Sequence, residues 1–283
     1  MMRSMIGATA VVLACACLTI CPTRADAQIP PGLQNPQIEI VYAVPSNASY
    51  RPIYDRLKQR QVLEELRAFL APLKLPRKLT VNVDQCGAAR RPYKPQGPVT
   101  ICYELVAEIT QTASKLDASL QPSVTAGAFI LVALQALAHG VYDELQIPVW
   151  GRMEDASDRL AALVMLQFGE DLALRTILGA TALFTASGKT WAVSDFGNAL
   201  SPDEQRYYNY LCIAYGGAPI TFKFLTVPDK NGEQTLPSAR AERCADEYAQ
   251  VLKAFNLWIM PSVDPNLLVR VRATPWLQAG DLK

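Results

Sequence analysis

The chain has 283 residues, of which 50% are hydrophobic and 19% are charged, and its formal net charge is +1. This apolar content is enough to build one sizeable core, so length and composition predict a single domain. A nearly neutral chain has no electrostatic basis for binding nucleic acid or an anionic membrane surface, and neither is an expected partner.

The N-terminus has the pattern of a secretory signal peptide. Arg3 supplies a positive charge, Met5–Ile20 is an apolar run, and an A-x-A sequence at 25–27 is a suitable cleavage site. We therefore expect a leader over residues 1–27 and a mature domain over residues 28–283, exported to the periplasm or secreted by a bacterium.

Two other interpretations of the leader stay open. Met5–Ile20 would act as a membrane anchor if it were not cleaved, although it is short for a span. Lipidation on Cys15 or Cys17 is the second, although the match to a lipidation motif is poor. In the mature chain the closest approach to a membrane span is Ala126–Ala138, which is too short and is interrupted by Gln135. No membrane span is therefore expected there.

The mature chain keeps cysteines at positions 86, 102, 212 and 244. An even number in an exported chain favours disulfides over free thiols. We expect Cys86–Cys102, which would bridge two strands, and Cys212–Cys244, which would join two helices. A thiolate metal site is the alternative, but no C-x-x-C spacing supports it.

The first part of the mature chain mixes strands with a helix. Residues of high β-propensity predict strands over Ile38–Val44, Leu79–Val83 and Val99–Tyr103. A helical period of apolar residues predicts a helix over Ile53–Leu70, which Pro72 stops. The last two strands, closed by the expected disulfide, suggest an antiparallel hairpin.

The rest of the chain is expected to be mainly helical. Apolar periodicity with flanking Pro or Gly predicts helices over Glu104–Leu116, Ala126–Leu145, Met153–Gln167, Asp171–Phe184, Asp203–Tyr215 and Ala239–Trp258. Ser187–Ala199 and Thr221–Glu233 have the composition of loops. Leu267–Arg272 has an alternating pattern that does not decide between helix and strand. The fold class is therefore α+β, mainly helical, with a small mixed or antiparallel sheet.

The two central predicted helices each carry a polar pair four residues apart. Gln135 and His139 share one face of the first, and Glu154 and Asp158 share one face of the second. This is the skeleton of a zinc site in which H-E-x-x-H gives two imidazole ligands and a general base, and a later helix gives a carboxylate. Here the first half reads Q-A-L-A-H, over residues 135–139.

A resemblance to a known family covers most of the chain after the leader. It is carried by AHGVYDELQIPVWGRMEDASDRLA (138–161), DEQRYYNYLCIAYG (203–216) and RCADEYAQVLKAFNLWIMP (243–261). These stretches are similar to a bacterial family of unknown function described as putative metallopeptidases (domain of unknown function 4344). The resemblance implies a zincin-like fold and a peptide or protein partner.

In zincin folds an edge strand lies beside the cleft and pairs with an extended substrate. Val99–Tyr103 is the candidate for that edge, with Val99, Ile101 and Tyr103 as cleft residues. Arg90 and Arg91 would reach the same cleft unless they belong to a solvated turn, which is the simpler interpretation.

Two residues that this zinc chemistry requires are replaced. Gln135 stands at the position of a ligand histidine, Ala136 stands at the position of the catalytic glutamate, and His139 is the only histidine. The ligands that remain possible are His139, Glu154 and either Asp155 or Asp158. Loss of general acid–base help alone costs on the order of a hundredfold to ten-thousandfold in rate. We therefore expect no catalytic residue and no firmly held cofactor, with zinc possible only at a vestigial site.

These polar groups would also form a network without metal. In that hypothesis Gln135 donates to Asp158 and His139 pairs with Glu154, so that no polar group is buried alone. Three functions stay open. They are an inactive metallopeptidase homologue that binds a peptide or protein, a weak metal-dependent hydrolase using His139, Glu154 and Asp155 or Asp158, and a structural envelope protein without a ligand. We favour the first.

Overall fold

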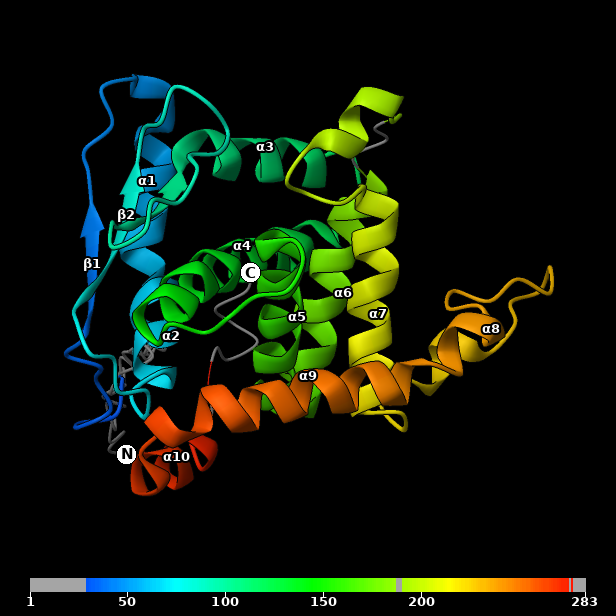
Figure 1. Cartoon of the computed structure of the whole chain (residues 1–283). Helices are drawn as coiled ribbons and strands as arrows, with labels where there is room; N and C mark the ends of the chain where they lie inside the picture. The colour runs from blue at the N-terminus through cyan, green and yellow to red at the C-terminus, as the bar shows by residue number, and fades with distance from the viewer. Residues whose placement is uncertain (1–28, 187–189, 275, 277–283) are drawn as a thin grey trace, which may run out of the picture.

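The computed structural model describes residues 29–186, 190–274 and 276, so the expected leader lies outside the described residues. A small sheet packs beside a larger set of helices (Figure 1). The predicted class, a mainly helical α+β domain with a small sheet, is confirmed.

All strands of the sheet run parallel, in the order β1-β2-β3. They are β1 (Ile38–Tyr42), β2 (Leu79–Asp84) and β3 (Val99–Cys102), with Ile38 opposite Leu79 and Val81 opposite Val99. The antiparallel hairpin expected of the last two is therefore wrong. Parallel neighbours need a crossover of roughly a dozen residues or more, and residues 85–98 are long enough to return along the sheet.

The helix predicted over Ile53–Leu70 is in fact two helices. α1 (Arg51–Arg60) and α2 (Val62–Phe69) are separated by Gln61, whose φ of 53° is left-handed and cannot continue a helix. The central helices follow close to the expected ranges, as α3 (Tyr103–Ala113), α4 (Gln121–Glu144), α5 (Met153–Met165), α6 (Glu170–Ala186) and α7 (Asp203–Gly217).

The C-terminal part differs from the prediction in two places. The last long helix is divided into α8 (Ser238–Ala241) and α9 (Cys244–Trp258). The ambiguous tail is helical, as α10 (Pro265–Arg272). Asp264 begins that helix, because its carboxylate accepts hydrogen bonds from the first backbone N–H groups.

α4 is the central helix of the core. It packs against α5, α6 and the sheet. In its most apolar stretch of 18 residues, 78% is buried inside the protein. It is long and apolar enough to cross a membrane, but burial of this extent is that of a core helix. A Cβ on Gly127 would lie 2.5 Å from the carbonyl oxygen of Thr176 in α6, so the glycine allows the two helices to approach closely.

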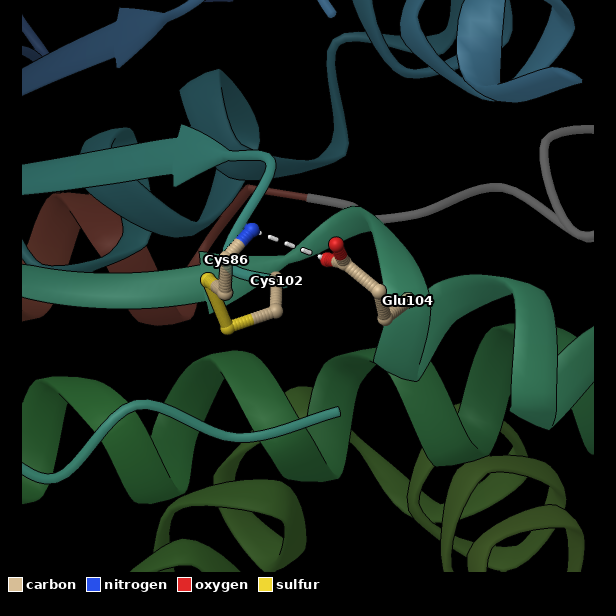
Figure 2. A group of neighbouring side chains, drawn as sticks. All are labelled: Cys86, Cys102 and Glu104. Atoms are coloured by element: carbon tan, nitrogen blue, oxygen red, sulfur yellow. Dashed lines mark hydrogen bonds between the residues drawn. A yellow bond between two sulfur atoms is a disulfide. The ribbon is translucent and has the colours of Figure 1, made fainter. Parts of the chain in front are cut away.

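Both predicted disulfides are confirmed. Cys86–Cys102 joins the C-terminal ends of β2 and β3, and Cys212–Cys244 joins α7 to the start of α9. Glu104, in the first turn of α3, accepts a hydrogen bond from the backbone N–H of Cys86 at 3.0 Å (Figure 2). It also accepts one from the backbone N–H of Gly87 at 2.8 Å. The disulfides are consistent with an extracellular or periplasmic protein.

Candidate functional site

Four of the predicted site residues of the central helices line a cleft of about 370 Å³. Gln135, Ala136 and His139 reach it from α4, and Glu154 reaches it from the first turn of α5. The other walls come from β3, from the loop that precedes β3, and from residues 191–200. The sequence skeleton therefore corresponds to a real cavity.

Glu154 connects the two central helices. Its Oε2 accepts a hydrogen bond from Gln135 Nε2 at 3.1 Å and lies 3.1 Å from His139 Nε2. The predicted pairing of His139 with Glu154 is confirmed. The predicted bond from Gln135 to Asp158 is wrong, because Gln135 donates to Glu154 and the carboxylate of Asp158 is held by other groups.

Asp158 belongs to a buried ion pair behind the cleft. Its Oδ2 accepts from Arg206 Nε at 2.7 Å, and its Oδ1 accepts from a second guanidinium nitrogen at 3.0 Å. The hydroxyl of Tyr210 donates to the same carboxylate at 3.4 Å, and the guanidinium lies 4.5 Å from the ring centre of Phe184. The side chains of Arg206 and Asp158 are only 4% and 6% exposed.

Sequence reasoning missed Arg206. It lies four residues before Tyr210 and seven before Ile213, so it continues a buried face of α7. A charged residue in line with an apolar face was the available signal, because such a residue needs a buried partner. Burial alone would lower the pKa of Arg206, but the charge and hydrogen bonds of Asp158 raise it above its ordinary value.

Asp155 faces away from the cleft and holds the segment that precedes α7. Its Oδ1 accepts a hydrogen bond from Ser201 Oγ at 2.6 Å. Arg152 donates to Ser201 Oγ and to the carbonyl oxygen of Phe196, at 3.3 and 3.1 Å. Asp155 is thus a structural anchor for one wall of the cleft.

The loop before β3 is fixed against the end of α4. Asp143 accepts hydrogen bonds from the hydroxyl of Tyr93 at 2.8 Å and from the backbone N–H of Gln96 at 2.6 Å. The Tyr93 ring lies 5.8 Å from the His139 ring, centre to centre, and covers that side of the histidine. Glu144 is turned elsewhere and forms a bidentate ion pair with Arg77 at 2.9 and 3.1 Å.

Of the three cleft residues predicted for Val99–Tyr103, the structure brings one into the cleft, and Tyr103 lies in the first turn of α3. Val99 lines the cleft, together with Thr100 and Cys102. Ile101 and Tyr103 are 1% and 0% exposed and do not line it. Arg90 and Arg91 both line the cleft, so the loop that carries them is more than a solvated turn.

The electrostatic environment keeps Glu154 ionised. Burial of this carboxyl raises its pKa, but the hydrogen bond and charge of His139, with the charges of Arg90 and Arg206, outweigh that effect and lower the pKa below its ordinary value. A carboxylate that accepts two hydrogen bonds and stays charged is a positioned acceptor, and it is a poor proton donor at neutral pH.

The residues that remain do not fit a catalytic zinc ion. Such a site needs three protein ligands around one point. Within the described ranges the one group of three or more His, Cys, Asp or Glu ligand atoms lying within 4.8 Å of one another is Cys86, Cys102 and Glu104, and its sulfurs form a disulfide. His139 and Glu154 do converge, but Asp158 is committed to Arg206. Asp158, the third predicted ligand, therefore does not join His139 and Glu154 around one point.

Residues 42–258 match a family described as putative metallopeptidases (domain of unknown function 4344). The chain belongs to this family. No curated protein and no solved structure matches it. Family membership supports a metallopeptidase-like interpretation of the domain, and the zincin-like form of the fold stays a prediction.

Proposed function

We propose that this member of the putative metallopeptidase family is a catalytically inactive, exported protein whose cleft binds a peptide or protein without cleaving it. One observation carries the proposal. Ala136 lines the cleft at the position where the family chemistry requires a carboxylate base, and its neighbour Gln135 is used to hold Glu154. A methyl group cannot accept a proton from water or pass one to a leaving amine.

The acidic groups around the cleft offer no substitute base. Asp143 holds the loop before β3, Glu144 holds Arg77, and Asp155 holds Ser201. Asp158 is neutralised by Arg206 in the interior. Glu154, the acidic residue that lines the cleft, has its Oε2 engaged by Gln135 and His139. Each of these described carboxylates therefore already has a structural partner, which argues against its use as a free base toward water in the cleft.

Ligand binding is supported by the walls of the cleft. β3 is an edge strand, and an extended peptide binds such an edge through main-chain hydrogen bonds. The facing walls combine apolar surface from Val99 and Val132 with the aromatic rings of Tyr93 and Trp191. These are the surfaces by which clefts usually bind peptides. The disulfides and the expected leader support export.

The first test is the zinc content and peptidase activity of the mature protein. It would be purified without chelator, incubated with zinc, dialysed, and analysed for bound metal and for cleavage of a mixed peptide substrate with and without chelator. We expect less than about 0.1 zinc per chain and no chelator-sensitive cleavage, because His139 and Glu154 are the only predicted ligands that converge among the described residues. One zinc per chain with cleavage that chelator abolishes would support the hydrolase alternative instead. If no peptide binds in the assays described below, the structural alternative is favoured.

A further inference from the structure

Arg90 is a cation in the cleft without a partner. Its side chain is exposed to the cleft, and no hydrogen bond or ion pair engages its guanidinium within the described part of the chain. It lies close enough to Arg206, Asp158, Glu154 and Glu108 for their charges to act on it. Desolvation, and then the charge of Arg206, lower the pKa of Arg90, and the charges of Asp158, Glu154 and Glu108 act in the opposite direction.

The carboxylates whose charges act on Arg90 are Asp158, Glu154 and Glu108, and none of them forms a hydrogen bond or ion pair with its guanidinium within the described residues. Glu154 is held by Gln135 and His139, and Asp158 is held by Arg206 and Tyr210. These bonds give both acids partners of their own. Arg90 therefore presents its hydrogen-bond donors to the open space of the cleft.

The loop that carries Arg90 is restrained on both sides. Before it, the disulfide Cys86–Cys102 and the hydrogen bonds that Cys86 and Gly87 donate to Glu104 hold the chain against β3 and α3. After it, Asp143 holds Tyr93. A donor on a fixed loop loses little conformational entropy on binding, which favours specific recognition.

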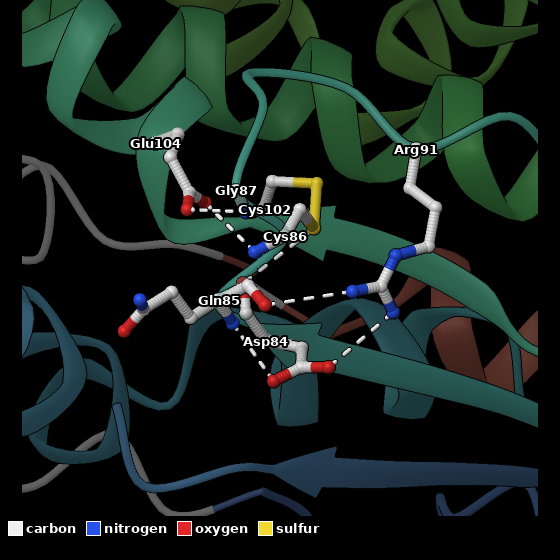
Figure 3. Close-up of a disulfide and its surroundings, with 7 residues drawn as sticks. All are labelled: Asp84, Gln85, Cys86, Gly87, Arg91, Cys102 and Glu104. Atoms are coloured by element: carbon white, nitrogen blue, oxygen red, sulfur yellow. Dashed lines mark hydrogen bonds and ion pairs between the residues drawn. A yellow bond between two sulfur atoms is a disulfide. The ribbon is translucent and has the colours of Figure 1, made fainter. Parts of the chain in front are cut away.

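Arg91 next to it behaves differently. Its guanidinium donates to Asp84 at 3.3 Å and to the carbonyl oxygen of Gln85 at 3.4 Å, so it is turned back toward the end of β2 (Figure 3). The two neighbouring arginines thus differ: Arg91 stabilises the loop, and Arg90 is open to the cleft.

We propose that Arg90 is the specificity residue of the cleft and binds a carboxylate of the peptide ligand, either its C-terminus or an acidic side chain. The planar fork of a guanidinium matches a carboxylate in a bidentate geometry. The walls from β3, Tyr93 and Trp191 would hold the adjoining backbone and side chains. This inference rests on the proposed function, because it names the ligand class of the same cleft.

The test is capture of random hexapeptides by the immobilised mature protein, with identification by mass spectrometry. One library has free C-termini and an otherwise identical library is C-terminally amidated. If Arg90 binds the terminus, the free library is retained and the amidated one is not. If Arg90 binds acidic side chains, both libraries are retained and the captured peptides are enriched in Asp and Glu.

Three variants make the test specific. Arg90→Gln should weaken binding of the selected peptides on the order of tenfold to a hundredfold, because a charge-assisted hydrogen bond is lost. Arg90→Lys, which keeps the charge without the fork, should retain part of the affinity. Arg175→Gln removes one positive charge from α6, where Arg175 pairs with Asp171, and should leave binding unchanged.

The outcomes separate the two proposals. Peptides captured without any preference for carboxylates, or captured equally by Arg90→Gln, would overturn the role of Arg90 and leave peptide binding in place. If neither library is retained by the wild-type protein, the proposed function fails together with the inference. A thermal melt of each variant shows whether it is folded. If Arg90→Gln is unfolded, the affinity of Arg90→Lys for the selected peptides tests the role of Arg90 instead.

Discussion

Arg206 holds both carboxylate oxygens of Asp158, at 2.7 and 3.0 Å, in a setting where neither side chain is more than 6% exposed. Asp158 is one of the acidic residues from which a metal site would be assembled. The ion pair removes it from the cleft and fixes α5 against α7. Asp158, which the sequence predicts as a metal ligand, therefore serves as a structural element of this fold.

This arrangement predicts a large loss of stability when one partner is removed. Arg206→Ala leaves a buried, uncompensated carboxylate and should lower the free energy of unfolding by about 3–5 kcal/mol in urea titration. The combined variant Asp158→Asn with Arg206→Met removes both charges and keeps an acceptor for Tyr210, so it should recover most of that loss. The exposed pair Arg175–Asp171 is the control, and Arg175→Ala should cost less than about 0.5 kcal/mol. Equal losses of unfolding free energy in Arg206→Ala and Arg175→Ala would contradict the argument from burial.

Glu104 gives the protein a pH-dependent restraint on the cleft loop. Burial of its carboxyl raises its pKa, but the hydrogen bonds from the backbone N–H groups of Cys86 and Gly87, with the charge of Arg91, lower the pKa below its ordinary value of 4.5. A carboxyl whose pKa is lowered by folding contributes stability above its unfolded pKa and loses it as the pH falls through the folded value.

We therefore expect wild-type protein to exceed Glu104→Gln in stability at pH 7, by about 1 kcal/mol because the group is partly solvated. The difference in Tm between the two proteins should stay constant down to about pH 5 and shrink as the pH falls below 4.5. A difference that grows on acidification would reverse the expected sign and exclude this role.

Gly127 is a close-approach position between α4 and α6. A Cβ there would lie 2.5 Å from the carbonyl oxygen of Thr176 and 2.8 Å from the nitrogen of Ala180. Both are backbone atoms, so Gly127→Ala must move one helix. We expect a net loss of about 1–3 kcal/mol, although alanine is the better helix former. Gly197→Ala is the matched control, because its Cβ would meet nothing within 4 Å, and a loss of similar size there would contradict the packing argument.

Much of the fold was accessible from the sequence because its local signals were strong. Periodic apolar residues located the central helices, and an even number of cysteines in an exported chain indicated the disulfides. The direction of β3 was missed, although Cys86 follows the end of β2 and Cys102 ends β3. A disulfide between two C-terminal strand ends places them at the same edge of a sheet, which is the parallel arrangement.

The site was predictable only in part. Spacing on two helices placed His139 opposite Glu154, because residues four apart share a face. It could not show which acid Gln135 would bind, since that depended on Arg206, which lies 48 residues after Asp158 in the sequence. The open position of Arg90 depends likewise on distant contacts of its loop, such as the bond of Tyr93 to Asp143, 50 residues away.

The convergence of Gln135 and His139 on Glu154 predicts that a zinc site can be rebuilt with two substitutions. Both side-chain nitrogens lie 3.1 Å from the same carboxylate oxygen. In the double variant Gln135→His with Ala136→Glu, a second imidazole would reach that oxygen from the same turn of α4. Two imidazoles and one carboxylate are a sufficient protein ligand set for zinc.

We expect zinc at about a hundred times its Kd to raise the Tm of the double variant by roughly 5–10 °C, since binding to the folded state alone adds about 2.7 kcal/mol. The wild-type Tm should not respond to zinc. Ala136→Glu alone supplies a base without a ligand, so it should also show no zinc response. Adding Arg90→Gln should strengthen zinc binding, because that variant removes a cation close to Glu154. If wild-type protein responds to zinc as strongly as the double variant, the site was never lost and the protein should be assayed as a hydrolase.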